Sequence, residues 1–439
     1  MSQFNRTALQ DIDTGGGVPR GPRPPAVDAA GRRSLDDQVD YLLASIEPLA
    51  PFGMSLADAW GLSLCEDIIA ETNLPSVPVV EVDGYAFAIE DLATVPGART
   101  TLVVAQGESA FNAVGIGEAV PVKAGQPLPR AADTVVANWQ VTPGEEAGRA
   151  VIKLRTKVAA GDWVRPAGTE ASAGELLAKA GTPLNDRRSA LLAAAGFTRV
   201  LARPRTRIAV VQVTDANNPN PPDGGRTPGA GVHLINGAAR ADGATVFRVH
   251  VDLTDLPRAH DHLNDELIRA DLVLTVGGMT EAGADPRLIT LLHGMGEVEE
   301  TLVAMRPGQR HGFGKIADDK TPVLMLPSDP PALLAAYHAF ARPVLRKMMG
   351  AEPISHEPML CFAERDMEVE PGVTELVPCR LVEHRNRYMA SEITSRRHAI
   401  LPTLVNADAL VILPGDKGRV FAGEALAAWL LGDPRSVTE

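Results

Sequence analysis

The alternation of strand-like and helix-like segments between residues 206 and 349 constrains the fold more than any other feature. Short apolar runs typical of buried strands, such as TRIAVVQV, FRVHV, DLVLTV and PVLML, are separated by segments with helical periodicity. Such alternation is typical of a parallel sheet covered by helices. We therefore predict an α/β domain over residues 205–349, whose ligands would bind at the carboxyl ends of its strands.

The remainder of the chain predicts additional β structure and a few helices. An apolar stripe predicts a helix over 34–46 capped by Ser34, and SLADAWGLSLC predicts a second helix capped by Ser55. Short strand-like runs with Gly and Pro between them occupy much of 100–154 and the region after 350. We predict an α/β plus β multidomain fold, divided into a disordered tail (1–33), an N-terminal domain (34–76 and 150–204), an inserted β domain (77–149), the α/β domain (205–349) and a C-terminal β domain (350–435).

Composition excludes some classes of function. The net charge of −13 argues against non-specific binding of nucleic acid, which depends on basic side chains at phosphates. Three scattered cysteines, Cys65, Cys361 and Cys379, form no CxxC pair and favour a reducing compartment. We see no apolar signal segment and no run long enough to span a bilayer, so we expect a cytoplasmic protein without a membrane span.

Three strand ends of the predicted sheet carry residues suited to binding an anion. They are Asp215, the pair Gly277–Gly278, and Ser328–Asp329 at the start of a helix. Backbone amides next to glycines and at helix starts bind phosphate, so their convergence predicts a phosphorylated ligand. Asp329 opposes this interpretation because a capping carboxylate would occupy the same amides and repel a phosphate.

A basic segment offers positive charge to balance such a ligand. AMRPGQRHGFGK contains Arg306, Arg310 and Lys315. The alternative interpretation is a solvated basic loop, and the sequence by itself favours that alternative.

Several segments resemble the MoeA family, which includes the C-terminal domain of gephyrin. LPSVPVVEVDGYAFAIEDL is similar to the family pattern LPxFDNSAMDGYAxxxxDL, and VKAGQPLPRAADTVV to MTGAPLPxGADxVV. GDWVRPAGTEASAGELLAKAGTPL is similar to GxNxRxxGEDxxxGxxxLxxGTxL, and further matching runs follow in family order. The resemblance covers about residues 34 to 435.

The resemblance implies a fold and an activity. It implies an elongated homodimer of four-domain subunits that inserts molybdate into adenylylated molybdopterin, aided by Mg²⁺, with release of AMP. It implies a catalytic and metal-binding role for Asp215. The ligand-binding residues carried over from the family motifs are Asp83, Asn236, Gly277, Gly278, Asp285, Arg306 and Ser328.

Many positions in these motifs depart from the family pattern. The acidic residue of FDNSAMDGY is Pro78 here, the polar pair after it is Val79 and Val80, and a motif threonine is Ala124. Further departures affect the GED, STGDEL, KPGKP and GNP motifs, where the substitutes include Thr169, Ala216, Gln309, Arg310 and Asp329. Losing carboxylate and hydroxyl ligands removes what a metal and an oxyanion need.

Two hypotheses follow from these departures. The first is a dimeric, gephyrin-like scaffold with a degenerate active site, lost or altered insertion chemistry and no required cofactor, which binds a cytoskeletal or membrane-anchored partner protein. The alternative is a divergent but active transferase that uses molybdopterin and Mg²⁺. The scaffold is the hypothesis that the substitutions favour.

Overall fold

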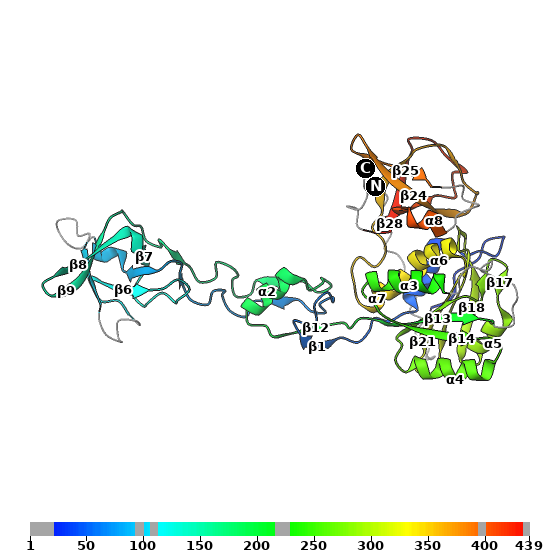
Figure 1. The fold of residues 1–439 in the computed structure, drawn as a ribbon, viewed down its shortest axis with the longest axis horizontal. Helices are drawn as coiled ribbons and strands as arrows, with labels where there is room; N and C mark the ends of the chain where they lie inside the picture. The colour runs from blue at the N-terminus through cyan, green and yellow to red at the C-terminus, as the bar shows by residue number, and fades with distance from the viewer. Residues whose placement is uncertain (1–21, 93–100, 106–112, 216–228, 394–400, 433–439) are drawn as a thin grey trace, which may run out of the picture. The chain divides into compact units, whose positions relative to one another are not determined.

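The computed structural model describes residues 22–92, 101–105, 113–215, 229–393 and 401–432. The chain forms two compact units, one of Met1–Pro51 with Arg203–Glu439 and the other of Phe52–Ala202, and each is described by itself (Figure 1). Predictions for residues 1–21 and for Ala216 lie outside the described residues.

The first unit contains the predicted α/β domain, built on a six-stranded sheet. The strand order is β14-β13-β15-β21-β20-β18, and the first four strands run parallel. The strands are β13 (Arg207–Thr214), β14 (Thr245–Asp252), β15 (Leu272–Val276), β18 (Gly296–Leu302), β20 (Arg310–Ile316) and β21 (Thr321–Leu326).

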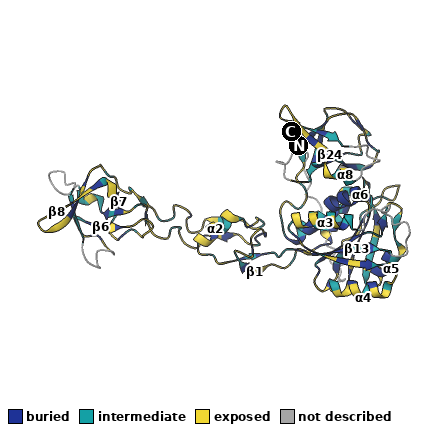
Figure 2. Ribbon diagram, viewed as in Figure 1, coloured by how far each residue is buried: buried dark blue, intermediate teal, exposed yellow. Residues whose placement is uncertain are grey.

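Helices cover both faces of this sheet because its central strands are apolar on both sides. Ile208 and Leu274 face one hydrophobic core, and Ala209 and Val273 face the other. Figure 2 shows the resulting pattern, with α6 buried and the outer side of α4 exposed. The covering helices are α1 (Leu35–Ala44), α3 (Ala230–Ala241), α6 (Pro330–Ala336) and α7 (Arg342–Met348) on the first core, and α4 (Leu256–Leu267) and α5 (Pro286–His293) on the second.

The sheet is mixed, which corrects the prediction of a parallel sheet. Strand β20 runs antiparallel to β21, and β18 runs antiparallel to β20. The basic segment AMRPGQRHGFGK, for which the sequence favoured a solvated loop, is therefore largely a strand, in which His311 and Phe313 are buried. The period-2 pattern is hidden there by glycines at positions 312 and 314, whose absent side chains admit neighbouring strands and side chains.

Helices α6 and α7 form one helical segment joined by a π-helical turn at Tyr337–Ala341. The backbone N–H of Arg342 donates to the carbonyl of Tyr337, five residues earlier. Pro343 has no N–H and its ring would collide with a carbonyl four residues back in a regular α-helix. The wider turn accommodates this proline within the buried helix.

Residues 28–33 were predicted to lie in a disordered tail, and the structure corrects this. Asp28 accepts hydrogen bonds that close a turn to Arg32. Arg33 is 8% exposed and makes a bidentate pair with Glu299, with both N···O distances 2.9 Å. A guanidinium that matches a carboxylate in this way fixes the chain ahead of α1.

Helix α1 was assigned to the N-terminal domain, but it belongs to the first unit. Ser34 caps it as predicted, accepting from the backbone N–H of Asp37 at 3.1 Å. Leu42 and Ile46 lie in the core of the α/β domain, where α1 packs against α7. The apolar stripe was identified correctly, but the surface that it buries against was not.

The C-terminal part of the first unit is a β domain, as predicted. Its strands follow the order β19-β24-β25-β22-β28-β26, and a further pairing of β24 with β26 closes the sheet. Strand β19 (Met305–Arg306) comes from the α/β domain and pairs in parallel with β24. The other strands are β22 (Met359–Ala363), β24 (Thr374–His384), β25 (Arg387–Glu392), β26 (Ala409–Leu413) and β28 (Ala425–Leu430), accompanied by a β23–β27 pair (Met367–Glu368 and Arg419–Val420) and by α8 (Leu401–Val405).

The second unit contains the predicted inserted β domain, which extends further than expected. The predicted boundary at residue 149 is wrong because β9 pairs with both β5 and β8 of the same sheet. The sheet has the order β7-β4-β6-β5-β9-β8. Its strands are β4 (Gly84–Phe87), β5 (Thr101–Val104), β6 (Glu118–Val122), β7 (Thr134–Ala137), β8 (Val141–Glu146) and β9 (Arg149–Leu154).

The rest of the second unit consists of short strand pairs and one helix. The helix predicted from Ser55 is wrong: Ser55 ends a strand, accepts from the N–H of Asp58 in a turn, and Gly61 then reverses the chain with φ at +78°. The elements are β1 (Phe52–Ser55) with β12 (Arg199–Ala202), β2 (Ile68–Ile69) with β11 (Leu176–Ala178), β3 (Val79–Val80) with β10 (Val164–Arg165), and α2 (Asp186–Ala194).

Together the two units confirm the multidomain α/β plus β class. Among the helices of the described residues, none combines the length and the apolar character that crossing a bilayer requires.

Candidate functional site

The three strand ends selected from the sequence meet at one edge of the α/β sheet. Strand β15 lies between β13 and β21, with Val276 opposite Gln212 on one side and opposite Leu326 on the other. All three strands run in the same direction, so Asp215, the glycine pair and Ser328 follow neighbouring carboxyl ends. The predicted meeting of these strand ends at one edge is therefore observed.

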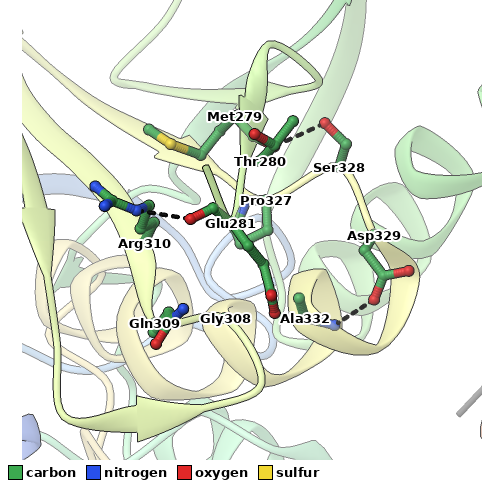
Figure 3. Close-up of a pocket in the computed structure, with 10 residues that line it drawn as sticks. All are labelled: Met279, Thr280, Glu281, Gly308, Gln309, Arg310, Pro327, Ser328, Asp329 and Ala332. Carbon is green, nitrogen blue, oxygen red and sulfur yellow. Dashed lines mark hydrogen bonds between the residues drawn. The ribbon is translucent and has the colours of Figure 1, made fainter. Parts of the chain in front are cut away.

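A pocket of about 180 Å³ opens at this edge (Figure 3). Ser328 Oγ donates to the carbonyl of Met279 at 2.9 Å, which ties the end of β21 to the hairpin of β16 (Met279–Thr280) and β17 (Gly283–Ala284). The pocket is lined by Met279, Thr280, Glu281, Gly308, Gln309, Arg310, Pro327, Ser328, Asp329 and Ala332.

Asp329 caps helix α6 at the rim of the pocket, as the sequence predicts. Its carboxylate accepts from the backbone N–H of Ala332 at 3.4 Å (Figure 3). Pro330 and Pro331 carry no N–H, so few amides of this helix end are open to an anion. The helix start therefore carries negative charge in place of a phosphate-binding end.

Arg310 is the basic residue among the ten that line the pocket. Its Nε donates to the carbonyl of Glu281 at 2.8 Å, and its Nη1 lies 2.9 Å from a carboxylate oxygen of Glu300. The guanidinium is held at the pocket wall and partly neutralised there. An anion entering the pocket would meet Arg310 together with the carboxylates of Glu281 and Asp329.

Asp215 and Asp285 are brought together by Arg287, a residue that the sequence reasoning missed. Arg287 Nη2 lies 2.7 Å from a carboxylate oxygen of each aspartate. Hydrogen bonding from Arg287 holds the pKa of Asp285 below its usual value. The same two carboxylates raise the pKa of the guanidinium. The sequence does carry a signal for this arrangement. Asp285 caps α5, and an arginine two positions after a capping aspartate lies within reach of its carboxylate.

Close packing accounts for Gly277 and Gly278. Both have positive φ, +103° and +72°. A Cβ on Gly277 would lie 2.6 Å from the carbonyl oxygen of Val213, and one on Gly278 would lie 2.7 Å from Leu288. These glycines let β15 turn sharply past β13, so their presence does not depend on a bound phosphate.

Three further predicted residues lie away from the pocket lining. Arg306, predicted as a ligand-binding cation, forms an ion pair with Glu370 of the C-terminal domain and is not among the pocket-lining residues. Asn236 lies on α3 and is not among the pocket-lining residues. Asp83 belongs to the second unit, where its carboxylate accepts from the backbone N–H of Ala124 at 2.8 Å and braces a turn.

The acidic residues of this edge do not fit Mg²⁺ as they stand. The ion requires several oxygen ligands in near-octahedral geometry, and Arg287 occupies the carboxylates of Asp215 and Asp285. Within the described ranges, no three His, Cys, Asp or Glu side chains are grouped so that they could hold a metal. A metal would have to displace the guanidinium first.

Replacing Arg287 with methionine is expected to strengthen binding of Mn²⁺, a paramagnetic probe for Mg²⁺ sites, by about tenfold (~1.4 kcal/mol). The change leaves two carboxylates of like charge close together, and a divalent cation relieves their repulsion. Titration followed by electron paramagnetic resonance measures the bound Mn²⁺.

Arg258→Met, on the exposed side of α4, is the matched control and should bind Mn²⁺ like the wild type. Equal Mn²⁺ affinities for the wild type and the Arg287→Met variant would show that the guanidinium does not block the carboxylates.

Comparison with known proteins places this architecture in one family. The description "MoeA N-terminal region (domain I and II)" matches residues 33–196, and "MoeA C-terminal region (domain IV)" matches residues 363–431. The molybdopterin biosynthesis moeA protein of Pyrococcus horikoshii has a similar structure, with a TM-score of 0.72 and 22% identity, covering 91% of this chain and 99% of that one. The fold is thus that of the molybdopterin biosynthesis proteins of the MoeA type.

Relatives of known name agree along nearly the whole length. Molybdopterin molybdenumtransferase 1 of Mycobacterium tuberculosis is 27% identical over 436 residues, which is 89% of this chain and 97% of the relative. Molybdopterin molybdenumtransferase of Bacillus subtilis is 23% identical over 394 residues, 86% of this chain and 89% of the relative. The chain belongs to the MoeA family.

Proposed function

We propose that this chain is a molybdenum-cofactor biosynthesis protein of the MoeA type that binds a molybdopterin ligand but has lost or altered the insertion of molybdate. The observation that carries the proposal is the pairing of Arg287 with Asp215 and Asp285. The aspartate expected to hold a metal is instead the partner of a fixed cation.

Retention of ligand binding is supported by the position of the pocket. It lies at the carboxyl edge of the α/β sheet, where open α/β folds bind their ligands. Arg310 supplies positive charge, and Ser328 and Gln309 supply neutral polar groups. The relatives that share almost the full length of the chain are named for molybdopterin.

Altered chemistry is supported by the structural use of the substituted positions. Val80, where the family pattern has a polar residue, is 1% exposed and packs in the core of the inserted β domain. Val79 and Val80 together form β3, which pairs with β10. Apolar side chains in a strand cannot coordinate an oxyanion or a metal.

The alternative function is an active molybdopterin molybdenumtransferase. The names and the nearly full coverage of the relatives favour it. In that case the substrate or the metal would have to displace Arg287 from Asp215 during the reaction.

We also propose that the chain is a homodimer that binds a partner protein of the cytoskeleton or of a membrane-anchored complex.

A calorimetric titration with molybdopterin and with its adenylylated form tests the proposed function. Adenylylated molybdopterin should bind, and subsequent addition of molybdate and Mg²⁺ should release no more AMP than a protein-free sample does. Stoichiometric release of AMP, measured by chromatography, would overturn the loss of chemistry and establish the alternative.

An isosteric change in the pocket tests where the ligand binds. Gln309→Glu adds a negative charge to the lining and should weaken binding of an anionic ligand by about tenfold (~1.4 kcal/mol). Asn264→Asp makes the same chemical change on α4, outside this lining, and should bind like the wild type. Equal binding by the Gln309→Glu variant would place the ligand elsewhere.

A further inference from the structure

Two tryptophans lie together on the surface of the second unit. Trp139 is 62% exposed and Trp163 is 38% exposed, in a chain with only 4 tryptophans. Their ring centroids are 5.9 Å apart and their planes cross at 82°. The two rings form an exposed aromatic corner, and Trp139 lies in the 3₁₀ turn Asn138–Gln140 between β7 and β8.

The indole of Trp163 is held in place by specific hydrogen bonds. Its Nε1 donates to Gln140 Oε1 at 3.1 Å, and the same oxygen accepts from the backbone N–H of Ala137 at 3.0 Å. The carbonyl of Trp163 accepts from the N–H of Glu81 at 2.9 Å. An exposed side chain anchored in this way loses little conformational freedom when a partner binds.

The backbone of Trp163 adopts a left-handed conformation, with φ at +54°. Bulky residues adopt this conformation at an energetic cost, whereas asparagine adopts it readily. The chain therefore keeps a large, exposed side chain at a strained backbone position, and such strain is typical of binding sites.

The surroundings of the corner favour a cationic partner. Three acidic residues are close to the corner along the backbone. The N–H of Glu81 donates to the carbonyl of Trp163, and the carbonyl of Asp83 accepts from the N–H of Asn138. Asp162 directly precedes Trp163. The nearby Arg165 pairs with Glu81 and Glu170. The indole face attracts cations more strongly than any other side-chain ring.

We propose that Trp139 and Trp163 form a docking corner for an arginine- or lysine-bearing segment of a partner protein. The two exposed rings suit a side chain presented by another protein, and the net charge of −13 favours approach of a basic segment.

Binding of a synthetic peptide with two arginines, Ac-GRPRG-NH2, to the full chain tests the proposal. Tryptophan fluorescence and calorimetry should detect binding, and the same peptide with citrulline in place of arginine should bind about tenfold more weakly, since citrulline keeps the shape and loses the charge. Equal binding of the two peptides, or no binding of either, would overturn the proposal.

Trp163→Asn separates docking from folding. This variant should lose about tenfold in affinity for the arginine peptide. The variant should still unfold cooperatively on heating, as circular dichroism measures, because asparagine adopts the left-handed conformation readily. Trp60→Phe changes another exposed tryptophan of the same unit, outside the corner, and should bind the peptide like the wild type. A Trp163→Asn variant that binds the peptide normally would refute the corner as the site.

Discussion

Replacing Asp242 with alanine is expected to lower the free energy of unfolding by about 3–5 kcal/mol. Asp242 accepts from the hydroxyl of Tyr337 at 2.7 Å and from Arg342 Nε at 2.9 Å. The side chains of Arg342 and Asp242 are only 14% and 13% exposed. Removing the carboxylate leaves a charge and a hydroxyl buried without their acceptor, and urea unfolding followed by circular dichroism measures the loss.

Two controls separate the charge from the hydroxyl. Tyr337→Phe removes only the hydrogen bond from the hydroxyl to the carboxylate and should cost about 1.5–3 kcal/mol. Asp261→Ala, an exposed aspartate on α4, should be nearly neutral. A loss for Asp242→Ala no larger than that for Asp261→Ala would show that solvent compensates Arg342 in the variant.

Acid is expected to destabilise the first unit as the pH falls from about 6.5 toward 3. His311 is fully buried and His338 is 9% exposed, and burial lowers the pKa of each to about 3. Arg33 near His311, and Arg342 and His356 near His338, oppose protonation further. The unfolded chain takes up protons near pH 6.5 while the folded state does not, so the stability present at neutral pH is lost on acidification.

The geometry explains why His338 stays neutral. Its Nδ1 lies 2.8 Å from Nε2 of His356, so one ring donates to the other, and Trp429 of the C-terminal domain stacks on His356. A second proton would place two donors face to face. By linkage, each histidine that remains neutral costs about 2 kcal/mol of stability at pH 5.

Urea unfolding at a series of pH values between 7.5 and 4.5 measures this dependence. His338→Gln cannot titrate and should flatten the decline, whereas His384→Gln, at the exposed end of β24, should leave it unchanged. An identical decline of stability with pH in the wild type and the His338→Gln variant would mean that the His338–His356 pair does not cause the decline.

The parts of the fold that depend on local periodicity could be predicted from the sequence. The apolar runs of β13 and β15 and the helix capped by Ser34 follow from the residues within each segment. The pairing of Arg33 with Glu299 and of β19 with β24 could not be predicted, because each joins residues far apart in the chain. The turn after Ser55 was mistaken for a helix because a capping serine favours both.

The candidate site divides in the same way. The convergence of Asp215, Gly277 and Ser328 could be predicted because parallel strands end at one sheet edge. The reach of long side chains could not: Arg287 extends to two aspartates, and Arg306 turns to Glu370. Spacing along a chain locates a Cα but does not determine where a flexible guanidinium ends.

Strand β19 has a consequence for how the C-terminal β domain of this chain could be exchanged for another domain. The C-terminal β domain is continuous in sequence from about residue 350, yet one of its strands, Met305–Arg306, is contributed by the preceding domain. If a different β domain were joined to this chain at about residue 350, β19 would have to pair with a strand other than β24. The unit of this chain that could be exchanged intact is therefore larger than the domain, because it has to include residues 305–306 together with β24.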